Sequence, residues 1–140
     1  MHRSIPALVS AAAFALPVAN AWATAPTSAA RTKVVTKRVV GAAAQADRWG
    51  DVQVTLVVRK TTTTFGTKTT VKRRITSVSA TYPNHTDRSV FINQQALPYL
   101  YQEVLRAQFN PNIDLVGGAT DTSYAFAESL QSAILAAKKA

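Results

Sequence analysis

Alternation of apolar and polar residues marks the clearest strand of the chain. From 52 to 58 the apolar residues Val, Val, Leu and Val take every second position, which is typical of a strand with one buried face. The stretches 34–40 and 75–82 are also rich in β-forming residues. Turn-forming residues at 47–50 and Gly66 separate the three stretches. This order predicts three antiparallel strands joined as hairpins.

Two later stretches have the spacing of amphipathic helices. The first runs over 97–105, and Pro98 predicts that its regular part starts near Asn93 or Leu97, because proline is best tolerated in a first turn. The second begins near Thr122, and its apolar stripe is Phe126, Leu130, Ala133, Ile134 and Ala137. The pattern predicts an α+β fold, a small antiparallel sheet of three to four strands with two helices packed on one side.

The N-terminal 23 residues have the pattern of a secretory signal peptide. A basic start precedes an uncharged run that ends in Ala21-Trp22-Ala23, an A-x-A-like cleavage site. Export to the periplasm, cell envelope or medium is therefore expected, with an uncleaved membrane anchor as the alternative. Residues 24–35 are expected to form a flexible linker, since Ala, Thr, Ser and Pro dominate their first part. Residues 36–140 then form one domain.

Charge and composition narrow the function only in part. The chain carries 16 Lys and Arg against 7 Asp and Glu, a net charge of +9 that favours anionic partners. The absence of cysteine excludes disulfides and thiolate chemistry, and no spacing typical of a metal site or a hydrolase is present, so neither metal nor catalytic residues are predicted. The basic stretch 60–74 is interpreted as a solvated strand edge that discourages pairing. The alternative is a docking patch for an acidic partner, a membrane or a cell-wall polymer.

The loop 114–123, DLVGGATDTS, is the candidate ligand site. Gly117 and Gly118 leave the backbone open to a bulky partner. Thr120 places a hydroxyl within about one turn of a helix N-terminus, where free N–H groups and the helix dipole favour a phosphate. The simpler alternative is an ordinary helix start with Thr122 or Ser123 as N-cap.

The same loop, with the segments before it, resembles the FMN-binding domain of small exported flavoproteins and of subunits of sodium-pumping quinone reductases. The similar segments are RWGDVQVTLVV, ITSVSATYP, RSVFINQQALPYLYQEVLRAQ and NIDLVGGATDTSYAFAESLQSAI. The resemblance extends over roughly residues 36 to 138. It implies the motif D-x-x-S/T-G-A-T/S, with Asp114 first and Thr120 last. Gly117 and Asp121 differ from the residues common in that family.

This resemblance implies a covalent flavoprotein. A dedicated flavin transferase would esterify the FMN phosphate onto Thr120, and backbone N–H groups from Gly118 to Ser123 would meet the phosphate. The implied cofactor-binding residues are Thr120, Asp114, Gly117, Gly118, Ala119, Asp121, Thr122 and Ser123. The expected role is electron transfer to a membrane or extracytoplasmic redox partner, without turnover of its own.

Two other functions stay open at this point. One is a protein that binds FMN reversibly, as a sensor or reductase. The other is a flavin-free basic module that attaches through 31–38 and 68–74 to anionic envelope polymer or nucleic acid, although no nucleic acid is expected if the chain is exported. Denaturation separates these possibilities, because only a covalent flavin stays with the chain.

Overall fold

The computed structural model describes residues 29–140. In chain order they form strand β1 (Arg31–Val40), strand β2 (Ala44–Gln45), a short 3-10 turn (Asp47–Trp49), strand β3 (Asp51–Phe65), strand β4 (Lys68–Thr81), helix α1 (Asp87–Ala107) and helix α2 (Thr120–Lys139). The predicted signal peptide and the first part of the predicted linker lie outside the described residues.

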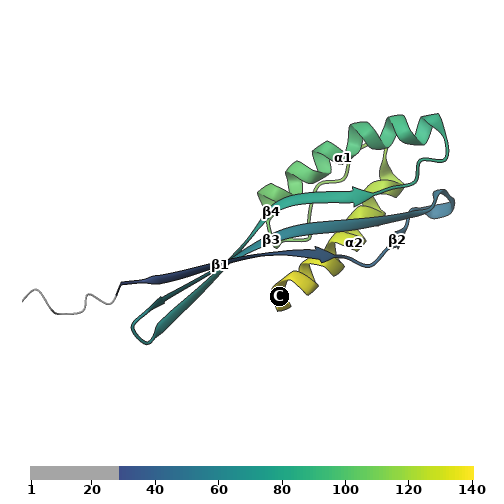
Figure 1. The fold of residues 1–140 in the computed structure, drawn as a ribbon. Coiled ribbons are helices and arrows are strands. Elements are labelled where there is room, and N and C mark those ends of the chain that lie inside the picture. The colour runs from purple at the N-terminus through teal and green to yellow at the C-terminus, as the bar shows by residue number, and fades with distance from the viewer. Residues whose placement is uncertain (1–28) are drawn as a thin grey trace, which may run out of the picture.

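Strand β3 is the centre of an antiparallel sheet (Figure 1). On one side it pairs with β1, and β2 continues the same side at Asp51 and Val52. On its other side it pairs with β4 along almost its whole length. The tight turn between β3 and β4 contains Gly66 at a φ of 58°, where glycine is favoured. The predicted hairpins at 47–50 and at Gly66 are therefore confirmed.

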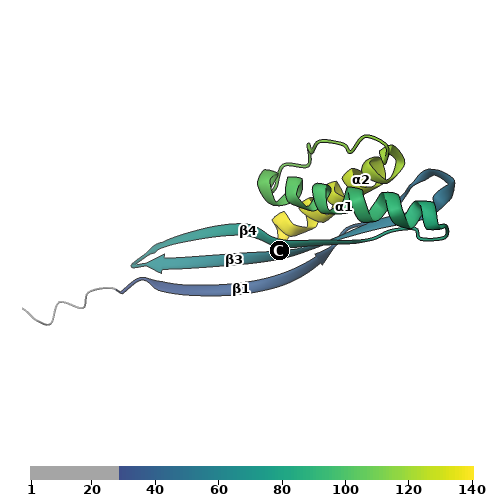
Figure 2. The ribbon, with the colours of Figure 1, turned by 90° about the horizontal axis from the view of Figure 1, so that it is seen from above.

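Both helices cover one face of this sheet, as Figure 2 shows. The alternating residues Val52, Val54, Leu56 and Val58 are buried on that face. Every residue of the predicted α2 stripe is buried with them, in one core that also contains Leu97, Leu100 and Val104 of α1. The predicted α+β class, with a small antiparallel sheet and two helices on one side, is confirmed. None of the helices between residues 29 and 140 is long and apolar enough to cross a membrane.

The predicted linker is wrong at its C-terminal end. Residues 31–35 belong to β1 and pair with Lys60 to Thr64 of β3. The composition of this segment predicted a tether, because such residues can bury little apolar area. The structure agrees on this point, since all five residues but Val35 are exposed. Backbone pairing with a long central strand orders them instead.

The predicted start of α1 is also wrong. The helix begins at Asp87, ahead of the expected 93–97, because Thr86 acts as N-cap and its Oγ1 accepts a hydrogen bond from the Ser89 N–H at 3.1 Å. Pro98 consequently lies inside the helix. Its position is exposed, so the carbonyl one turn earlier, which loses its usual N–H partner, is within reach of water. Burial of the neighbouring core face offsets the cost of this proline.

Three strand segments extend beyond the helices as a projecting arm (Figures 1 and 2). We use "the arm" for residues 31–36 of β1 together with 59–74, which contain the ends of β3 and β4 and the turn between them. None of these residues is buried. The last core residues before the arm are Val58 and Ile75. The arm is therefore held by main-chain pairing to the rest of the sheet and has no core of its own.

Helix α2 is attached to the sheet through a buried serine. The Oγ of Ser129 accepts a hydrogen bond from the N–H of Val54 at 2.8 Å. The oxygen of Val54 accepts from the N–H of Gly41 at 2.8 Å. A Cβ built on Gly41 would overlap the main-chain oxygen of Ser129, so glycine is required where the chain leaves β1 and passes under the helix.

Tyr101 attaches α1 to β4. Its hydroxyl accepts a hydrogen bond from the Ala80 N–H at 2.9 Å, and its ring lies 6.0 Å from that of Phe126. Burial raises the pKa of Tyr101 above its usual value, the Ala80 bond acts in the opposite direction, and Tyr82 adds to the rise. The fold thus favours the neutral phenol. This contribution to stability is present below about pH 10 and is lost as the pH rises through the raised pKa.

We expect Ser129→Ala to lower the free energy of unfolding by about 1–3 kcal/mol, because the buried Val54 N–H loses its acceptor. Urea denaturation followed by circular dichroism measures this change. Ser132→Ala is the matched control on the same helix, since the Ser132 Oγ accepts from the Ala42 N–H at an exposed position where water can replace it. Its effect should stay within about 0.5 kcal/mol. Equal losses in the two variants would contradict the role assigned to Ser129.

Candidate functional site

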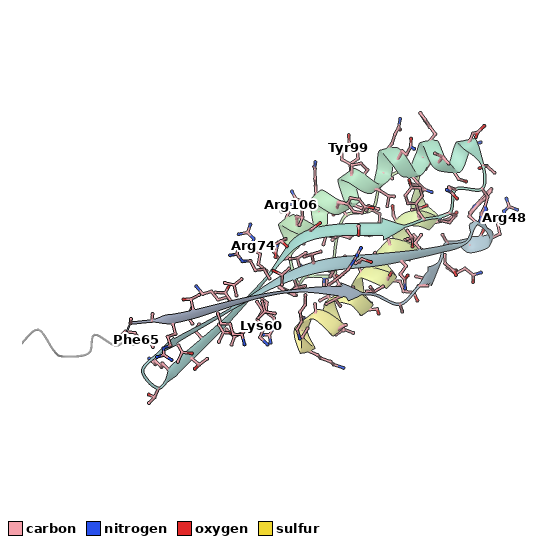
Figure 3. All side chains as sticks on the ribbon, viewed as in Figure 1. Arg48, Lys60, Phe65, Arg74, Tyr99 and Arg106 are labelled. Carbon is pink, nitrogen blue, oxygen red and sulfur yellow. The ribbon has the colours of Figure 1, made fainter. Side chains whose placement is uncertain are left out.

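A hollow of about 440 Å³ lies where the start of α2, the start of α1 and the turn before β3 meet. This volume is within the range of small-molecule sites, roughly 300–1,000 Å³. Its lining residues come from three separate parts of the chain: Arg48, Trp49, Pro83, Thr86, Arg88, Ser89, Ile92, Asn93, Gly118, Ala119, Thr120, Asp121 and Thr122. Figure 3 labels Arg48 at this end of the sheet and Phe65 at the opposite end.

The loop closes tightly before α2 begins. The Ala119 N–H donates to the Val116 oxygen at 3.2 Å, and Gly118 between them has a φ of 81°. The helix then starts at Thr120, with Ala119 as N-cap and no side-chain cap. The alternative in which Thr122 or Ser123 caps the helix is wrong, because both already lie within its first turn. Without a capping side chain, the N–H groups of Thr120, Asp121 and Thr122 are left for water or a ligand, whereas the Ser123 N–H donates to the Ala119 oxygen.

Three hydroxyl side chains start the helix, and two of them have structural partners. Thr122 Oγ1 donates to Asn93 Oδ1 at 2.8 Å. Ser123 is buried, and its Oγ accepts from the Val116 N–H at 3.2 Å, which fastens the loop to the helix. Thr120 is exposed and lines the hollow. It is therefore the hydroxyl that an incoming ligand can reach.

Asn93 connects the two helices beneath the hollow. Its side chain is only 3% exposed, and its Nδ2 donates to the Pro83 oxygen at 3.0 Å while its Oδ1 accepts from Thr122. A buried amide is stable only when both of its ends are hydrogen-bonded, as they are here. This arrangement fixes the start of α2 against the start of α1.

The turn before β3 contributes the aromatic residue of the hollow. The chain reverses at 47–50 with φ values of 48° at Asp47 and 121° at Gly50. The guanidinium of Arg48 lies 5.0 Å from the ring centroid of Trp49, a cation–π contact. Trp49 remains 40% exposed at the hollow. An arginine and an aromatic surface are thus presented together.

The electrostatics of the hollow suit an anion. Arg48 and Arg88 line it together with the start of α2, whose free N–H groups and dipole add positive charge, and Asp121 is the one carboxylate among the lining residues. Arginine offers a planar fork of donors that matches the oxygens of a phosphate. The balance of side-chain charge around the hollow is positive.

The predicted site residues divide into two groups. Gly118, Ala119, Thr120, Asp121 and Thr122 line the hollow. Outside its lining are Asp114, Gly117 and Ser123. Asp114 is exposed, Gly117 has open space where a side chain would be, and Ser123 holds the loop from below.

Sequence reasoning missed Arg48, Trp49 and Arg88. The first two were interpreted only as turn residues, and no role was predicted for Arg88. Their approach to Thr120 depends on tertiary packing between segments far apart in the sequence. One usable signal was present, a tryptophan next to an arginine in a turn, where aromatic residues have no structural advantage.

The residue types in the hollow fit a phosphorylated aromatic ligand. Arginines and helix N–H groups suit the phosphate, while Trp49 and Ile92 offer apolar area for a ring. Compared with known proteins, the chain matches no protein-family model, no curated protein and no solved structure.

We expect Asn93→Ala to destabilise the fold by about 1–3 kcal/mol, since Thr122 and the Pro83 oxygen both lose a buried partner. Gln94→Ala, at the exposed neighbouring position of the same helix, is the control and should change stability by less than about 0.5 kcal/mol. Chemical denaturation compares the two variants. Similar stabilities would show that the bridge from Asn93 does not hold the helices together.

Proposed function

We propose that the chain is an exported electron-transfer protein whose FMN is attached through a phosphoester at Thr120. The observation that carries the proposal is a difference in hydrogen bonding and exposure among the three hydroxyls at the start of α2. Thr122 and Ser123 are engaged in hydrogen bonds, whereas Thr120 is exposed at a hollow of positive charge. The resemblance to the FMN-binding domain points to the same residue.

The phosphate of FMN fits the polar side of the hollow. An ester at Thr120 lies at the first residue of α2, beside the unpaired N–H groups of that helix. Arg48 and Arg88 can each donate to its oxygens. Asp121 would oppose the negative charge, and the two arginines with the helix dipole outweigh this single carboxylate.

The isoalloxazine ring fits the apolar side. Trp49 and Ile92 offer it contact area, and the hollow is open to solvent on one side. When bound, FMN supplies one- and two-electron redox chemistry. The protein's own residues hold the phosphate, orient the ring and leave an edge accessible, as transfer to a membrane or extracytoplasmic partner requires.

Attachment needs only one nucleophile from this chain. The Thr120 Oγ1 would attack the FMN phosphorus of FAD, the bond to the AMP phosphate would break, and AMP would leave. A base on the flavin transferase would take the hydroxyl proton. The chain presents the hydroxyl, and Asp114 with the glycines before Thr120 is the segment that the family resemblance assigns to recognition by the transferase.

With a flavin transferase and FAD, we expect the chain to gain the mass of one FMN, and we expect Thr120→Ala to gain none because a phosphoester needs a hydroxyl. Thr120→Ser should retain part of the attachment, and Thr122→Ala should retain it because the Thr122 hydroxyl is already bonded to Asn93. Intact mass after denaturation measures each variant. Gly117→Ser, which restores the residue usual in the family, should raise the modified fraction if recognition extends to that position.

The result for wild type separates the proposal from its alternatives. Flavin that copurifies but is lost on denaturation would replace covalent attachment with reversible binding. No flavin in either state, with an active transferase present, would favour the flavin-free basic module. Equal added mass on Thr120→Ala and wild type would place the ester on another residue.

We expect Arg88→Gln to slow attachment by roughly tenfold or more, because a hydrogen bond to a charged group contributes about 1.5–3 kcal/mol. Arg106→Gln is the control on the same helix, at the opposite end from the hollow. Time courses of flavin incorporation compare the two variants. Matching rates would exclude a phosphate contact from Arg88.

A further inference from the structure

The arm carries a concentration of positive charge that the hollow does not explain. Its 22 residues include eight of the 16 Lys and Arg of the chain and no Asp or Glu: Arg31, Lys33, Arg59, Lys60, Lys68, Lys72, Arg73 and Arg74. Two further cations, Lys37 and Arg38, lie at its base on β1. Among residues 29–140 the one ion pair joins Arg106 to Glu103 within α1, so no carboxylate pairs with a cation of the arm.

The strand register places like charges opposite one another. Arg59 pairs with Arg74 across β3 and β4, and Lys60 pairs with Arg73 in the next position. Like charges directly opposite in a sheet are destabilising. Lys60 is partly relieved, since its Nζ donates to the main-chain oxygen of Ala140 at 3.0 Å. Arg59 and Arg74 are exposed. This arrangement lowers the stability of the free protein and would be relieved by an external anion.

Protection of strand edges accounts for only part of this charge. Cations on β4 and β1 would discourage pairing with another chain, because these are the edge strands. Arg59 and Lys60 lie on β3, the central strand, whose two sides are already paired. Protection of a strand edge therefore explains neither Lys60, which belongs to the stretch 60–74, nor its neighbour Arg59.

We propose that the arm binds a flexible linear phosphodiester polymer that lacks stacking bases, of the polyol-phosphate type found in cell envelopes. Successive residues of a strand point to opposite faces, so Arg59, Lys72 and Arg74 lie on one face of the arm. Lys33, Lys60 and Arg73 lie on the other. Nine threonines of the arm add hydroxyl donors between the cations. A flexible chain can contact both faces by passing around an edge.

Two other anionic partners fit less well. A bilayer is flat and would meet the cations of one face at a time, and the apolar tip is a single residue, Phe65, 58% exposed beside Thr64 and Gly66. Single-stranded nucleic acid is bound by aromatic platforms as well as charge. Phe65 is the one aromatic residue of the arm and lies at its tip, beyond the cationic rows at 59–61.

This binding site is separate from the proposed flavin site. The arm and the hollow lie at opposite ends of β3, as the labelled Phe65 and Arg48 show in Figure 3. The inference does not rest on the presence of FMN. Either proposal can fail while the other stands. Substitutions in the arm and matched substitutions in the hollow distinguish the two.

The test is binding of poly(glycerol phosphate) of fixed length to the full chain over a series of salt concentrations. Each neutralised phosphate contributes about 0.7 to the slope of log K against log salt. One such contact therefore raises the affinity at 0.1 M salt about fivefold relative to about 1 M salt. Arg59→Gln/Arg74→Gln should therefore weaken binding about 25-fold and reduce the slope by about 1.4. Its denaturation midpoint should not fall, because a repulsive pair is removed. Lys72→Gln/Arg73→Gln provides a second variant with the same expectation.

Arg48→Gln/Arg88→Gln is the control, with the same loss of charge at the opposite end of β3. This control should leave polymer binding unchanged and impair flavin attachment. The arm variants should weaken polymer binding and leave flavin attachment unchanged. Equal weakening by arm and control variants would overturn the proposal by showing that net charge alone matters. So would the absence of polymer binding, tighter binding to anionic phospholipid vesicles, or tighter binding to single-stranded DNA of equal charge.

Discussion

The hydrogen bond from the Val54 N–H to Ser129 determines how the layers of this protein fit together. In a strand, the N–H and oxygen of one residue point to the same side, and the Val54 oxygen accepts from Gly41. On that side β1 has ended at Val40, and β2 pairs only from Val52. The Val54 N–H therefore has no strand partner, and a side chain from α2 takes that place. The gap in the sheet is what positions the helix.

The position of α2 in turn positions the candidate site. Because Ser129 fixes the middle of the helix on β3 and Asn93 fixes its start against α1, Thr120 is held at the meeting point of three chain segments. None of these contacts uses the Thr120 side chain itself. The contacts that hold α2 in place are thus complete without a ligand, and the Thr120 hydroxyl remains exposed at the hollow.

The sequence was sufficient for the elements whose residues alternate between core and solvent. Val52 to Val58 and the α2 stripe were predictable because burial imposes a period on them. The arm was not, because none of its threonines and cations is buried on either face and they leave no such period. The early start of α1 was missed because Pro98 pointed to a first turn near 93–97, whereas the cap at Thr86 lies well before the apolar spacing of 97–105. The meeting of Arg48, Arg88 and Thr120 depends on how distant segments pack, which local pattern does not encode.

The direction of β1 has a consequence for where the domain can operate. Arg31 pairs with Thr64, so the chain enters the described fold at the tip of the arm, and β1 runs from there toward the body of the sheet, antiparallel to β3. Fifteen residues at about 3.3 Å each make β3 close to 50 Å long. Arg31 and Thr120 therefore lie near opposite ends of β3, a strand whose length is comparable to the thickness of a membrane with its headgroups, about 40–45 Å.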